Sequence, residues 1–534
     1  MSDSSIPSWD NNIPSSPPSS RPQLFADLIK SVDDVHSLPS PLDSPFSEHD
    51  VKTAATSLRK TTAPGPDSIP SSLLIKASPP LISALTNIFN FSWKNSVVPS
   101  EWKKADAFAI FKKGDRSDPS AYRLISITSV IMRLFERVVN TRLVSFLDTS
   151  NFFSPNQAGF RKNLCTLDNI YRLLRDSYSQ LSKHKQLPII FLDIIKAFDR
   201  VPHDLLLFKL FAYGGVCGKA WGWLRAFLQH RLFRVSQSGH FSDWHSATAG
   251  VPQGCVLSPL LFAVFINDLD SNINNLILSL FADDGAAWPE PARNQSYLTQ
   301  FKVLRKFLAF VQSWSVEWCL DFSLPKTQIL LVSNKRCHKK PSVPLTLHKH
   351  KIEFVDHYKY LGLTFQSNGR WNKQFASVVA KTKITANLIS RINSRNLPPG
   401  PLVTASLVKY ILIPQMAYAL QYWRPTKSQY RTLNQIIATP LRRALGLHKT
   451  SSAIRTMWEF GIPDLQSTRL KCLLQSTSRA LRSASNGHFL PSILSNDINS
   501  PNSSASSFYS RPFTHELSES ESEYIYGMLK VAVS

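Results

Sequence analysis

Three aspartates stand where this sequence could hold a pair of metal ions. Asp193 ends the apolar run PIIFLDI, while Asp283 and Asp284 stand together in LFADDGAAW, between two apolar segments. Mg²⁺ prefers oxygen ligands. Two such ions held by carboxylates stabilise both the attacking and the leaving oxygen of an in-line displacement at phosphorus. The residue types therefore fit two-metal phosphoryl or nucleotidyl transfer.

Short strands are the elements that would position these carboxylates. The apolar run 187–194 predicts a buried strand that delivers Asp193 to its end, and 276–288 predicts two strands meeting at an acidic turn. Since 90 residues separate Asp193 from Asp283, tertiary folding must bring them together. Taken singly, an aspartate at a strand end or in a hairpin is more often an ordinary turn residue. The local pattern leaves that alternative open.

The surrounding chain mixes strands with apolar-periodic helices. Residues 105–111 and 329–333 predict strands, whereas 129–147 and 296–320 predict helices. A chain of 534 residues can bury a large core and has room for about two to four domains. Its hydrophobic content of 43% is typical of a globular protein.

The charge of the chain indicates a polyanionic partner. The formal net charge is +24 and the isoelectric point is about 9.8. Such an excess causes self-repulsion unless a polyanion neutralises it. Nucleic acid is the leading candidate, an anionic membrane surface is the second, and an inert basic surface is the plain alternative.

Cysteine usage and the termini favour an intracellular protein. None of the six cysteines forms a C-x-x-C pair, which indicates reduced thiols in a cytoplasmic or nuclear compartment. The N-terminus lacks the order of residues of a signal peptide. No uncharged apolar run approaches the ~20 residues needed to span a bilayer, so we expect no membrane partner.

Composition divides the chain into five expected regions. Residues 1–46 are rich in Ser, Pro and Asp and predict a disordered leader, and 47–96 predicts an N-terminal helical extension. Region 97–365 carries the mixed strands and helices. Region 366–482 is helical and basic, with 18 Lys and Arg against two acids between its first and last arginine. Region 483–534 is of low complexity and is expected to be disordered.

Eight segments occur in the order of a known family. They are APGPDSI (63–69), WKKADAFAIFKKGDRSDPSAYRLISITSVIMRLFERVV (102–139), SPNQAGFRKNLCTLDNI (154–170), FLDIIKAFDRVPHDLLLFKL (191–210), AGVPQGCVLSPLLFAVFINDL (249–269), FADD (281–284), KTQILLVS (326–333) and YKYLGLTF (358–365). Through them the chain resembles the reverse transcriptase domain of non-LTR (LINE-like) retrotransposons, across about residues 50–480. One such motif alone would be weak evidence, whereas eight in family order are specific.

The resemblance implies an α+β, right-hand polymerase fold with fingers, an antiparallel-sheet palm and a helical thumb. Fingers and palm would occupy 97–365, with the fingers built from 97–187 and 205–248, and the thumb would occupy 366–482. The implied activity is RNA-directed DNA synthesis, with two Mg²⁺ ions (Mn²⁺ being a possible substitute) and with dNTPs added to a DNA primer on an RNA template. Because the leader is too short for the endonuclease that such elements usually carry, an endonuclease acting in trans is an expected further partner.

The resemblance also implies roles around the metal ions. Asp193, Asp283 and Asp284 would be the catalytic, metal-binding triad, and the backbone carbonyl of Ile194 would be a further ligand. Lys326 is similar to the lysine that protonates departing pyrophosphate, although a phosphate contact is an equally reasonable role for it.

Further residues resemble the family's nucleotide-binding set. Arg123 is similar to the arginine that closes on the triphosphate, a task that suits a forked cation. Lys113 or its neighbour Lys112 would make a second phosphate contact, with a solvated basic loop as the plain alternative.

Phe198, five residues after Asp193, resembles the steric gate that excludes a 2′-hydroxyl. An ordinary core phenylalanine is the alternative. Gln253 would border the nucleotide pocket, and Gly254 would let the backbone approach the substrate closely.

The last motif and the basic helices after it are expected to hold nucleic acid. Tyr360, Leu361 and Gly362 resemble the primer grip. The basic helices would follow sugar-phosphate backbones as a thumb. Trp371, Tyr410 and Trp423 could pack on sugars or bases, but a core position is the more common role for such residues.

Two other functions stay open from the sequence. An RNA-dependent RNA polymerase shares the palm and the paired aspartates, but Phe198 and FADD argue against it. A domesticated or degenerate, catalytically inactive nucleic-acid-binding derivative is the second. Leu124, where the family has proline, and Gly285, where threonine is frequent, depart from the family pattern without removing a group that the chemistry needs.

Overall fold

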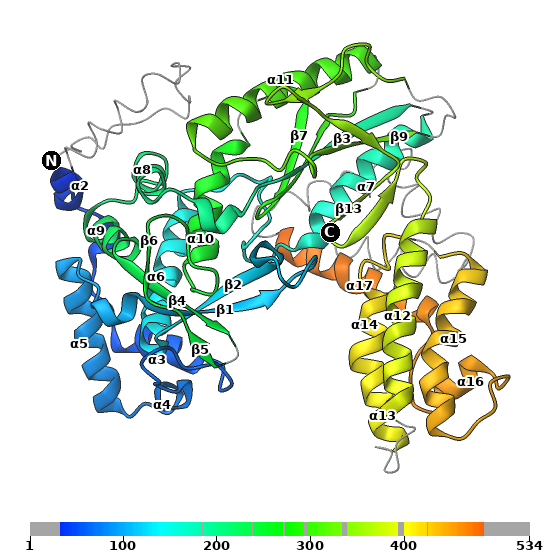
Figure 1. The fold of residues 1–534 in the computed structure, drawn as a ribbon, viewed down its shortest axis with the longest axis horizontal. Helices are drawn as coiled ribbons and strands as arrows, with labels where there is room; N and C mark the ends of the chain where they lie inside the picture. The colour runs from blue at the N-terminus through cyan, green and yellow to red at the C-terminus, as the bar shows by residue number, and fades with distance from the viewer. Residues whose placement is uncertain are drawn as a thin grey trace. The chain divides into compact units, whose positions relative to one another are not determined.

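Two compact units make up the described part of the chain (Figure 1). The computed structural model describes residues 32–183, 185–237, 239–270, 273–292, 296–333, 339–392, 400–423 and 425–484. Unit 1 comprises Met1–Ser154, Ile194–Ser271 and Ala309–Phe322, and unit 2 comprises Pro155–Asp193, Asn272–Leu308 and Ser323–Ser534. Each unit therefore combines segments that are far apart in sequence.

Unit 1 combines a small sheet with a group of helices. Its sheet has the strand order β2-β1-β4-β5, with β6 also paired to β4. The strands are β1 (Lys104–Phe111), β2 (Tyr122–Thr128), β4 (Arg231–Gln237), β5 (His240–Phe241) and β6 (His245–Ala247). The α-helices are α2 (Val32–Ser37), α3 (Glu48–Thr56), α4 (Ser71–Ile75), α5 (Pro79–Asn95), α6 (Val130–Thr149), α8 (His203–Ala212), α9 (Gly218–Leu228) and α10 (Ser258–Ile266). The second half of α11 (Tyr297–Glu317) also belongs to this unit.

An aromatic cluster forms part of the core of unit 1. Phe89 from α5 stacks on Phe135 from α6, with ring centroids 4.3 Å apart, and Trp223 from α9 lies 4.9 Å from Phe135. Phe46 is buried against Trp93 at 5.0 Å. Residues 32–46, part of the expected disordered leader, thus contain a helix and buried side chains, because α2 packs on α9 and Phe46 packs on α5 and α6. Residues 1–31 lie outside the described residues.

Unit 2 is built on a five-stranded sheet with the strand order β12-β9-β3-β8-β7. The strands are β3 (Gln186–Asp193), β7 (Leu276–Phe281), β8 (Asp284–Pro289), β9 (Gln328–Ser333) and β12 (Glu353–Val355). The central strand β3 is antiparallel to both β8 and β9. Its residues 187–192 are all buried, as expected for a continuous apolar run in mid-sheet. Helix α7 (Thr166–Ser182) packs against β3, β7 and β9.

The remaining elements of unit 2 are the short antiparallel pair β10 (Thr346–Leu347) and β11 (His350–Lys351), the first part of α11, a hairpin and a set of helices. The hairpin consists of β13 (His357–Tyr360) and β14 (Leu363–Gln366). The helices are α12 (Asn372–Ile392), α13 (Pro401–Leu407), the π-helix η6 (Val408–Leu412), α14 (Ile413–Ala417), α15 (Lys427–Ala444), α16 (Ala453–Trp458) and α17 (Leu465–Ala484). Of the expected low-complexity tail, only residues 483–484 are described, and they end α17.

The compact units do not follow the expected boundaries of palm and thumb. One continuous apolar core includes side chains of α7 and β3 and also side chains of α12, α15 and α16. Examples are Phe191, Val378 and Leu433. Removal of residues 370–482 would therefore expose to solvent the apolar side chains of the sheet and of α7 that pack against these helices. Similarly, 155–187, expected among the fingers, belongs to unit 2 because α7 covers the sheet.

Candidate active site

Two of the three candidate catalytic aspartates are direct neighbours across the sheet of unit 2. In the β3–β8 pairing, Asp193 is the partner of Asp284. The β7–β8 hairpin closes with Phe281 opposite Asp284, so Ala282 and Asp283 form a two-residue turn. Ala282 takes a φ of +55°, which is unusual for a residue other than glycine. The expected strand end and acidic turn are both confirmed, and they meet at one edge of the sheet.

Lys326 is the cation at this edge. Its Nζ lies 2.6 Å from Asp193 Oδ2, and the side chains are 51% and 20% exposed. The carbonyl of Asp193 accepts a hydrogen bond from the Ser323 backbone N–H at 2.7 Å, which places the segment leading to Lys326 beside the strand end. Lys326 thus contacts a candidate metal ligand directly.

Tyr358 completes the group and was missed from the sequence. Its ring stacks on Phe191 with centroids 4.0 Å apart, and its hydroxyl donates to the Lys326 carbonyl at 3.3 Å. Burial raises the pKa of Tyr358, and the nearby Asp193 and Asp284 carboxylates raise it further. The hydroxyl therefore stays protonated at neutral pH and is available as a donor. Its position two residues before Tyr360, on the same face of a strand, was the available signal.

The donor set suits a hard divalent cation, although the side chains are not drawn together around one point. Among the described residues, no group of three or more His, Cys, Asp or Glu side chains is placed to hold a metal ion. Asp193 forms an ion pair with the Lys326 ammonium, whereas a carboxylate that binds a metal ion directs its oxygens at that ion. The carboxylate oxygens of Asp193, Asp283 and Asp284 are nevertheless the ligands that Mg²⁺ or Mn²⁺ would select. Ile194 is buried, and its backbone forms an isolated β-bridge with Phe322; both residues belong to unit 1.

The phosphate-binding candidates lie on the β1–β2 hairpin of unit 1. Arg123 on β2 is the partner of Ile110 on β1 and is exposed. Lys112 and Lys113 are exposed just after β1, and the Lys112 backbone N–H donates to the Ala121 carbonyl at 2.8 Å. The hairpin thus presents all three cations to solvent from one end.

The loop that carries Gln253 and Gly254 lies against β2. Ser126 donates its backbone N–H to the Gln253 carbonyl at 2.6 Å. Gly254 has a φ of +121°, and a Cβ built on it would lie 2.4 Å from the Ser126 carbonyl oxygen. Only glycine fits there, and the backbone it approaches is the protein's own strand. The loop is also fixed by the buried Glu136 carboxylate, which accepts from the N–H groups of Val256 and Leu257 at 2.7 and 3.1 Å.

Phe198 is half-buried and stacks on Phe262 of α10 with centroids 4.6 Å apart. Its carbonyl accepts from the Val251 N–H at 2.7 Å. The next residue, Asp199, accepts a hydrogen bond from Gln253 Nε2 at 3.1 Å. Burial raises the Asp199 pKa, against the opposing effects of Gln253, Lys196 and Arg123. Asp199 was missed from the sequence, although it directly follows the candidate gate.

The candidate primer grip is the turn of the β13–β14 hairpin. Tyr360 is buried, and its hydroxyl donates to the Ser279 carbonyl on β7 at 3.2 Å. Leu361 and Gly362 form a two-residue turn in which both φ angles are positive, at +46° and +84°. The hairpin is thereby tied to the sheet that carries the aspartates.

The aromatic residues considered for nucleic-acid binding differ in exposure. Trp423 is completely buried, and Trp371 is half-buried and donates its ring N–H to the Tyr178 hydroxyl. Tyr410 is 71% exposed on the π-helix. Of the three, only Tyr410 presents most of its side chain to solvent.

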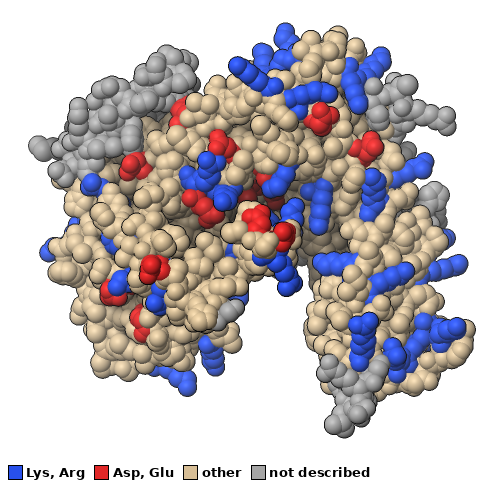
Figure 2. Space-filling view, viewed as in Figure 1, with Lys and Arg blue, Asp and Glu red and all other residues tan. Residues whose placement is uncertain are grey.

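Basic side chains cover the helices that follow the hairpin. Figure 2 shows Lys and Arg gathered over α12–α16 on the face in view, where no acidic side chain is seen on these helices. Lys381, Lys383 and Arg391 on α12 are all exposed. No described helix has the length and apolar character to cross a membrane.

Comparisons with known proteins agree with these features. Residues 110–365 match the family described as reverse transcriptase (RNA-dependent DNA polymerase). The chain is 28% identical over 434 residues to the RNA-directed DNA polymerase from mobile element jockey of Drosophila melanogaster, covering 78% of this chain and 46% of the relative. It is 26% identical over 389 residues to the probable RNA-directed DNA polymerase from transposon X-element of the same species, covering 71% and 42%. A solved structure of telomerase from Candida tropicalis, in complex with a telomeric RNA fragment, matches at 10% identity with a TM-score of 0.36, covering 71% of this chain and 64% of that chain.

The family match and the curated relatives confirm the expected family, and the mixed strands and helices agree with the expected fold class. The chain spans about half the length of the curated relatives it matches. The matched range contains the two aspartate-bearing strands, the candidate gate Phe198 and the hairpin of the candidate primer grip. The α+β, right-hand polymerase class is therefore established for this range. Residues 110–365 form a reverse transcriptase domain of the kind found in non-LTR retrotransposons.

Proposed function

We propose that this chain is an RNA-directed DNA polymerase that adds dNTPs to the 3′ end of a DNA primer on an RNA template. The observation that carries the proposal is the direct pairing of Asp193 with Asp284 on adjacent strands, with Asp283 in the turn beside them. Three carboxylates at one end of a sheet rarely serve structure alone, because their negative charges repel one another unless cations neutralise them.

Asp193, Asp283 and Asp284 would hold two Mg²⁺ ions, which supply charge neutralisation to the attacking and leaving oxygens when bound. Lys326 neutralises Asp193 in the free protein. Its ammonium is also placed to donate a proton near the same carboxylate, which suits departing pyrophosphate. The Tyr358 hydroxyl donates to the Lys326 carbonyl and fixes the backbone that carries this lysine.

The nucleotide set of unit 1 would bind the dNTP. Arg123, with Lys112 and Lys113, supplies donors for triphosphate oxygens. Phe198 would stand under the sugar, held by its stack on Phe262. Asp199 accepts a hydrogen bond from the Gln253 side-chain amide, which would fix the orientation of Gln253 beside the nucleotide.

The basic helices should make binding of an RNA–DNA hybrid strongly dependent on salt. Substitution of Lys381, Lys383 and Arg391 by glutamine removes three exposed cations from one helix. The slope of log affinity against log salt should then fall by about 0.9 for each phosphate that the variant no longer neutralises, a value measured for B-DNA. Fluorescence anisotropy with a labelled hybrid at several salt concentrations measures the slope.

A matched triple variant controls for net charge. Lys52, Lys60 and Lys94 are also exposed but belong to unit 1. Substituting them by glutamine lowers the net charge equally and should leave the slope close to that of wild type. If the two triple variants flatten the slope to the same extent, the assignment of α12 to nucleic-acid binding is wrong.

Primer extension on an RNA template tests the proposed function and its two alternatives. A DNA primer annealed to an RNA of mixed sequence is supplied with Mg²⁺ and with four dNTPs or four NTPs. We expect copying with dNTPs. Copying that favours NTPs would indicate an RNA polymerase. Salt-dependent hybrid binding without copying would indicate an inactive derivative. An intracellular location and an endonuclease supplied in trans are compatible with this function, and neither is needed for the assay.

A further inference from the structure

The candidate primer-grip turn has an unusual backbone. Leu361 has a φ of +46°, in the left-handed region that leucine rarely adopts. Gly362 follows with a φ of +84°, so the two-residue loop has the φ signature of a type I′ turn. A leucine keeps such a conformation only where its surroundings hold it.

Tyr418, at the C-terminal end of α14, holds the turn in place. Its hydroxyl donates to the Leu361 carbonyl at 2.5 Å. Its ring lies against Gly362, since a Cβ built on this glycine would be 3.0 Å from Tyr418 Cε1. Tyr418 thus fixes the carbonyl by a hydrogen bond and the second turn residue by packing. Burial raises the pKa of Tyr418, so the hydroxyl remains a donor at neutral pH.

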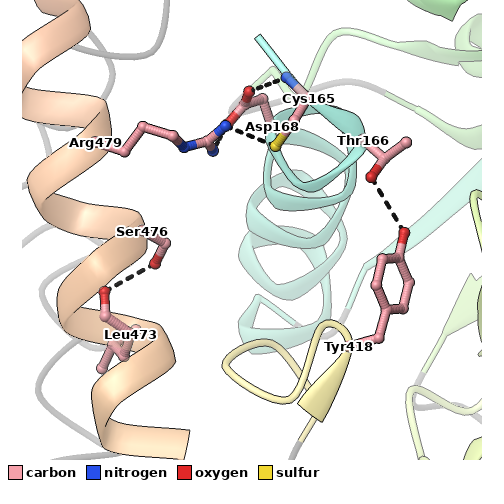
Figure 3. A network of polar contacts seen from close by, with 7 residues as sticks. All are labelled: Cys165, Thr166, Asp168, Tyr418, Leu473, Ser476 and Arg479. Carbon is pink, nitrogen blue, oxygen red and sulfur yellow. Dashed lines mark hydrogen bonds and ion pairs between the residues drawn. The ribbon is translucent and has the colours of Figure 1, made fainter. Parts of the chain in front are cut away.

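The same hydroxyl is anchored from a third element. Thr166, the first residue of α7, lies within hydrogen-bond distance of it, with 3.2 Å between the two oxygens (Figure 3). Tyr418 therefore joins the hairpin turn to the N-terminal end of α7. Helices α14 and α7 are both tied to the turn through this one side chain.

The N-terminal end of α7 is itself fixed by α17. Asp168 is 5% exposed, accepts the Cys165 N–H at 2.7 Å and pairs with the Arg479 guanidinium (Figure 3). Arg479 also donates to Cys165 Sγ at 2.6 Å. Burial raises the Asp168 pKa and Arg479 opposes that rise. Both partners of this ion pair lie in unit 2, as do Thr166 and Tyr418.

We propose that Tyr418 is a positioning residue for the primer 3′ end, acting through the Leu361–Gly362 turn. The inference rests on the proposed function, because it takes this turn to contact the primer. Without the hydroxyl, the Leu361 peptide loses the partner that fixes its direction. The primer terminus would then be held less tightly, whereas dNTP binding, assigned to unit 1, would be unaffected.

Tyr418→Phe tests the proposal because it removes only the hydroxyl and keeps the ring against Gly362. We expect the KM and Kd for the annealed primer–template to rise about two- to tenfold, the range for loss of one hydrogen bond. The KM for dNTP should stay within about twofold. Extension from a primer with a mismatched terminal base should fall further than extension from a matched one. The melting temperature should stay near that of wild type.

Two further variants sharpen the test. Thr166→Val removes the second partner of the hydroxyl and should give a smaller rise in primer–template KM. Tyr213→Phe removes a hydroxyl from an exposed tyrosine of unit 1 and should change neither KM. An unchanged primer–template Kd in Tyr418→Phe, or an equal rise in both KM values, would overturn the positioning role. If wild type extends no primer, the proposed function fails, and the Kd for the hybrid alone then decides the role of Tyr418.

Discussion

Asp193→Asn should reduce primer extension by about a thousandfold in kcat, with both dNTP and NTP substrates affected alike. Metal ions contribute several kcal/mol to stabilisation of the transition state, and each 1.36 kcal/mol corresponds to a tenfold change in rate. The amide keeps the shape of the carboxylate but removes one negative charge from the pair formed with Asp284. Asp284→Asn should have the same effect for the same reason. Single-turnover extension measures the rate.

The fold should survive this change. Lys326 is 51% exposed, so loss of its ion pair leaves an ammonium that water can solvate. Glu353→Gln is the matched control, since it removes an exposed carboxylate from β12 of the same sheet and should leave kcat within about twofold. Extension by Asp193→Asn at more than about a tenth of the wild-type rate would remove Asp193 from the chemistry.

Phe198→Ala should shift substrate choice rather than turnover. The side chain is half-buried, stacks on Phe262 and precedes Asp199, the residue that holds Gln253. A side chain that clashes with the 2′-hydroxyl and leaves it without hydrogen-bond partners rejects a ribonucleotide more strongly than a roomy apolar pocket does. Truncation should therefore raise NTP incorporation relative to dNTP by about ten- to two-hundredfold, equivalent to ~1–3 kcal/mol. Matched dNTP and NTP incorporation by wild type and variant gives the ratio.

Phe198→Leu separates the gate from packing, because it keeps most of the apolar volume against Phe262 and should shift the ratio less. Phe241→Ala removes an exposed ring from the sheet of unit 1 and should leave the ratio unchanged. If Phe198→Ala leaves the ratio at its wild-type value, the residue serves only as core, and the preference for deoxynucleotides has another source.

The strands that carry the aspartates were predictable from local sequence. A continuous apolar run marks β3 as a buried central strand, and two apolar segments around Asp283 and Asp284 mark the β7–β8 hairpin. The pairing of Asp193 with Asp284, rather than with Asp283, follows from strand register. Register depends on the packing of whole strands, so spacing in sequence does not determine it.

Other interactions depend on tertiary structure alone. Tyr358 contacts Lys326 because β13 lies beside the segment that leads into β9. Asp199 contacts Gln253, which is 54 residues away in the sequence. The expected thumb boundary also differs from the compact units, because apolar residues of α12 and α15 share a core with β3. Charge and helical periodicity identify those helices, but they do not show which surface the apolar faces cover.

Metal binding tests the central claim most directly, independently of turnover. Mn²⁺ bound to the full chain is counted by electron paramagnetic resonance, with an RNA template, a primer that ends in a dideoxynucleotide and the next dNTP present. Two Mn²⁺ per protein are expected for wild type, as two-metal nucleotidyl transfer requires. Asp193→Asn should bind at least one fewer, whereas Glu353→Gln should bind the same number as wild type. Two Mn²⁺ retained by Asp193→Asn at the wild-type affinity would contradict the assignment of Asp193, Asp283 and Asp284 as the metal site.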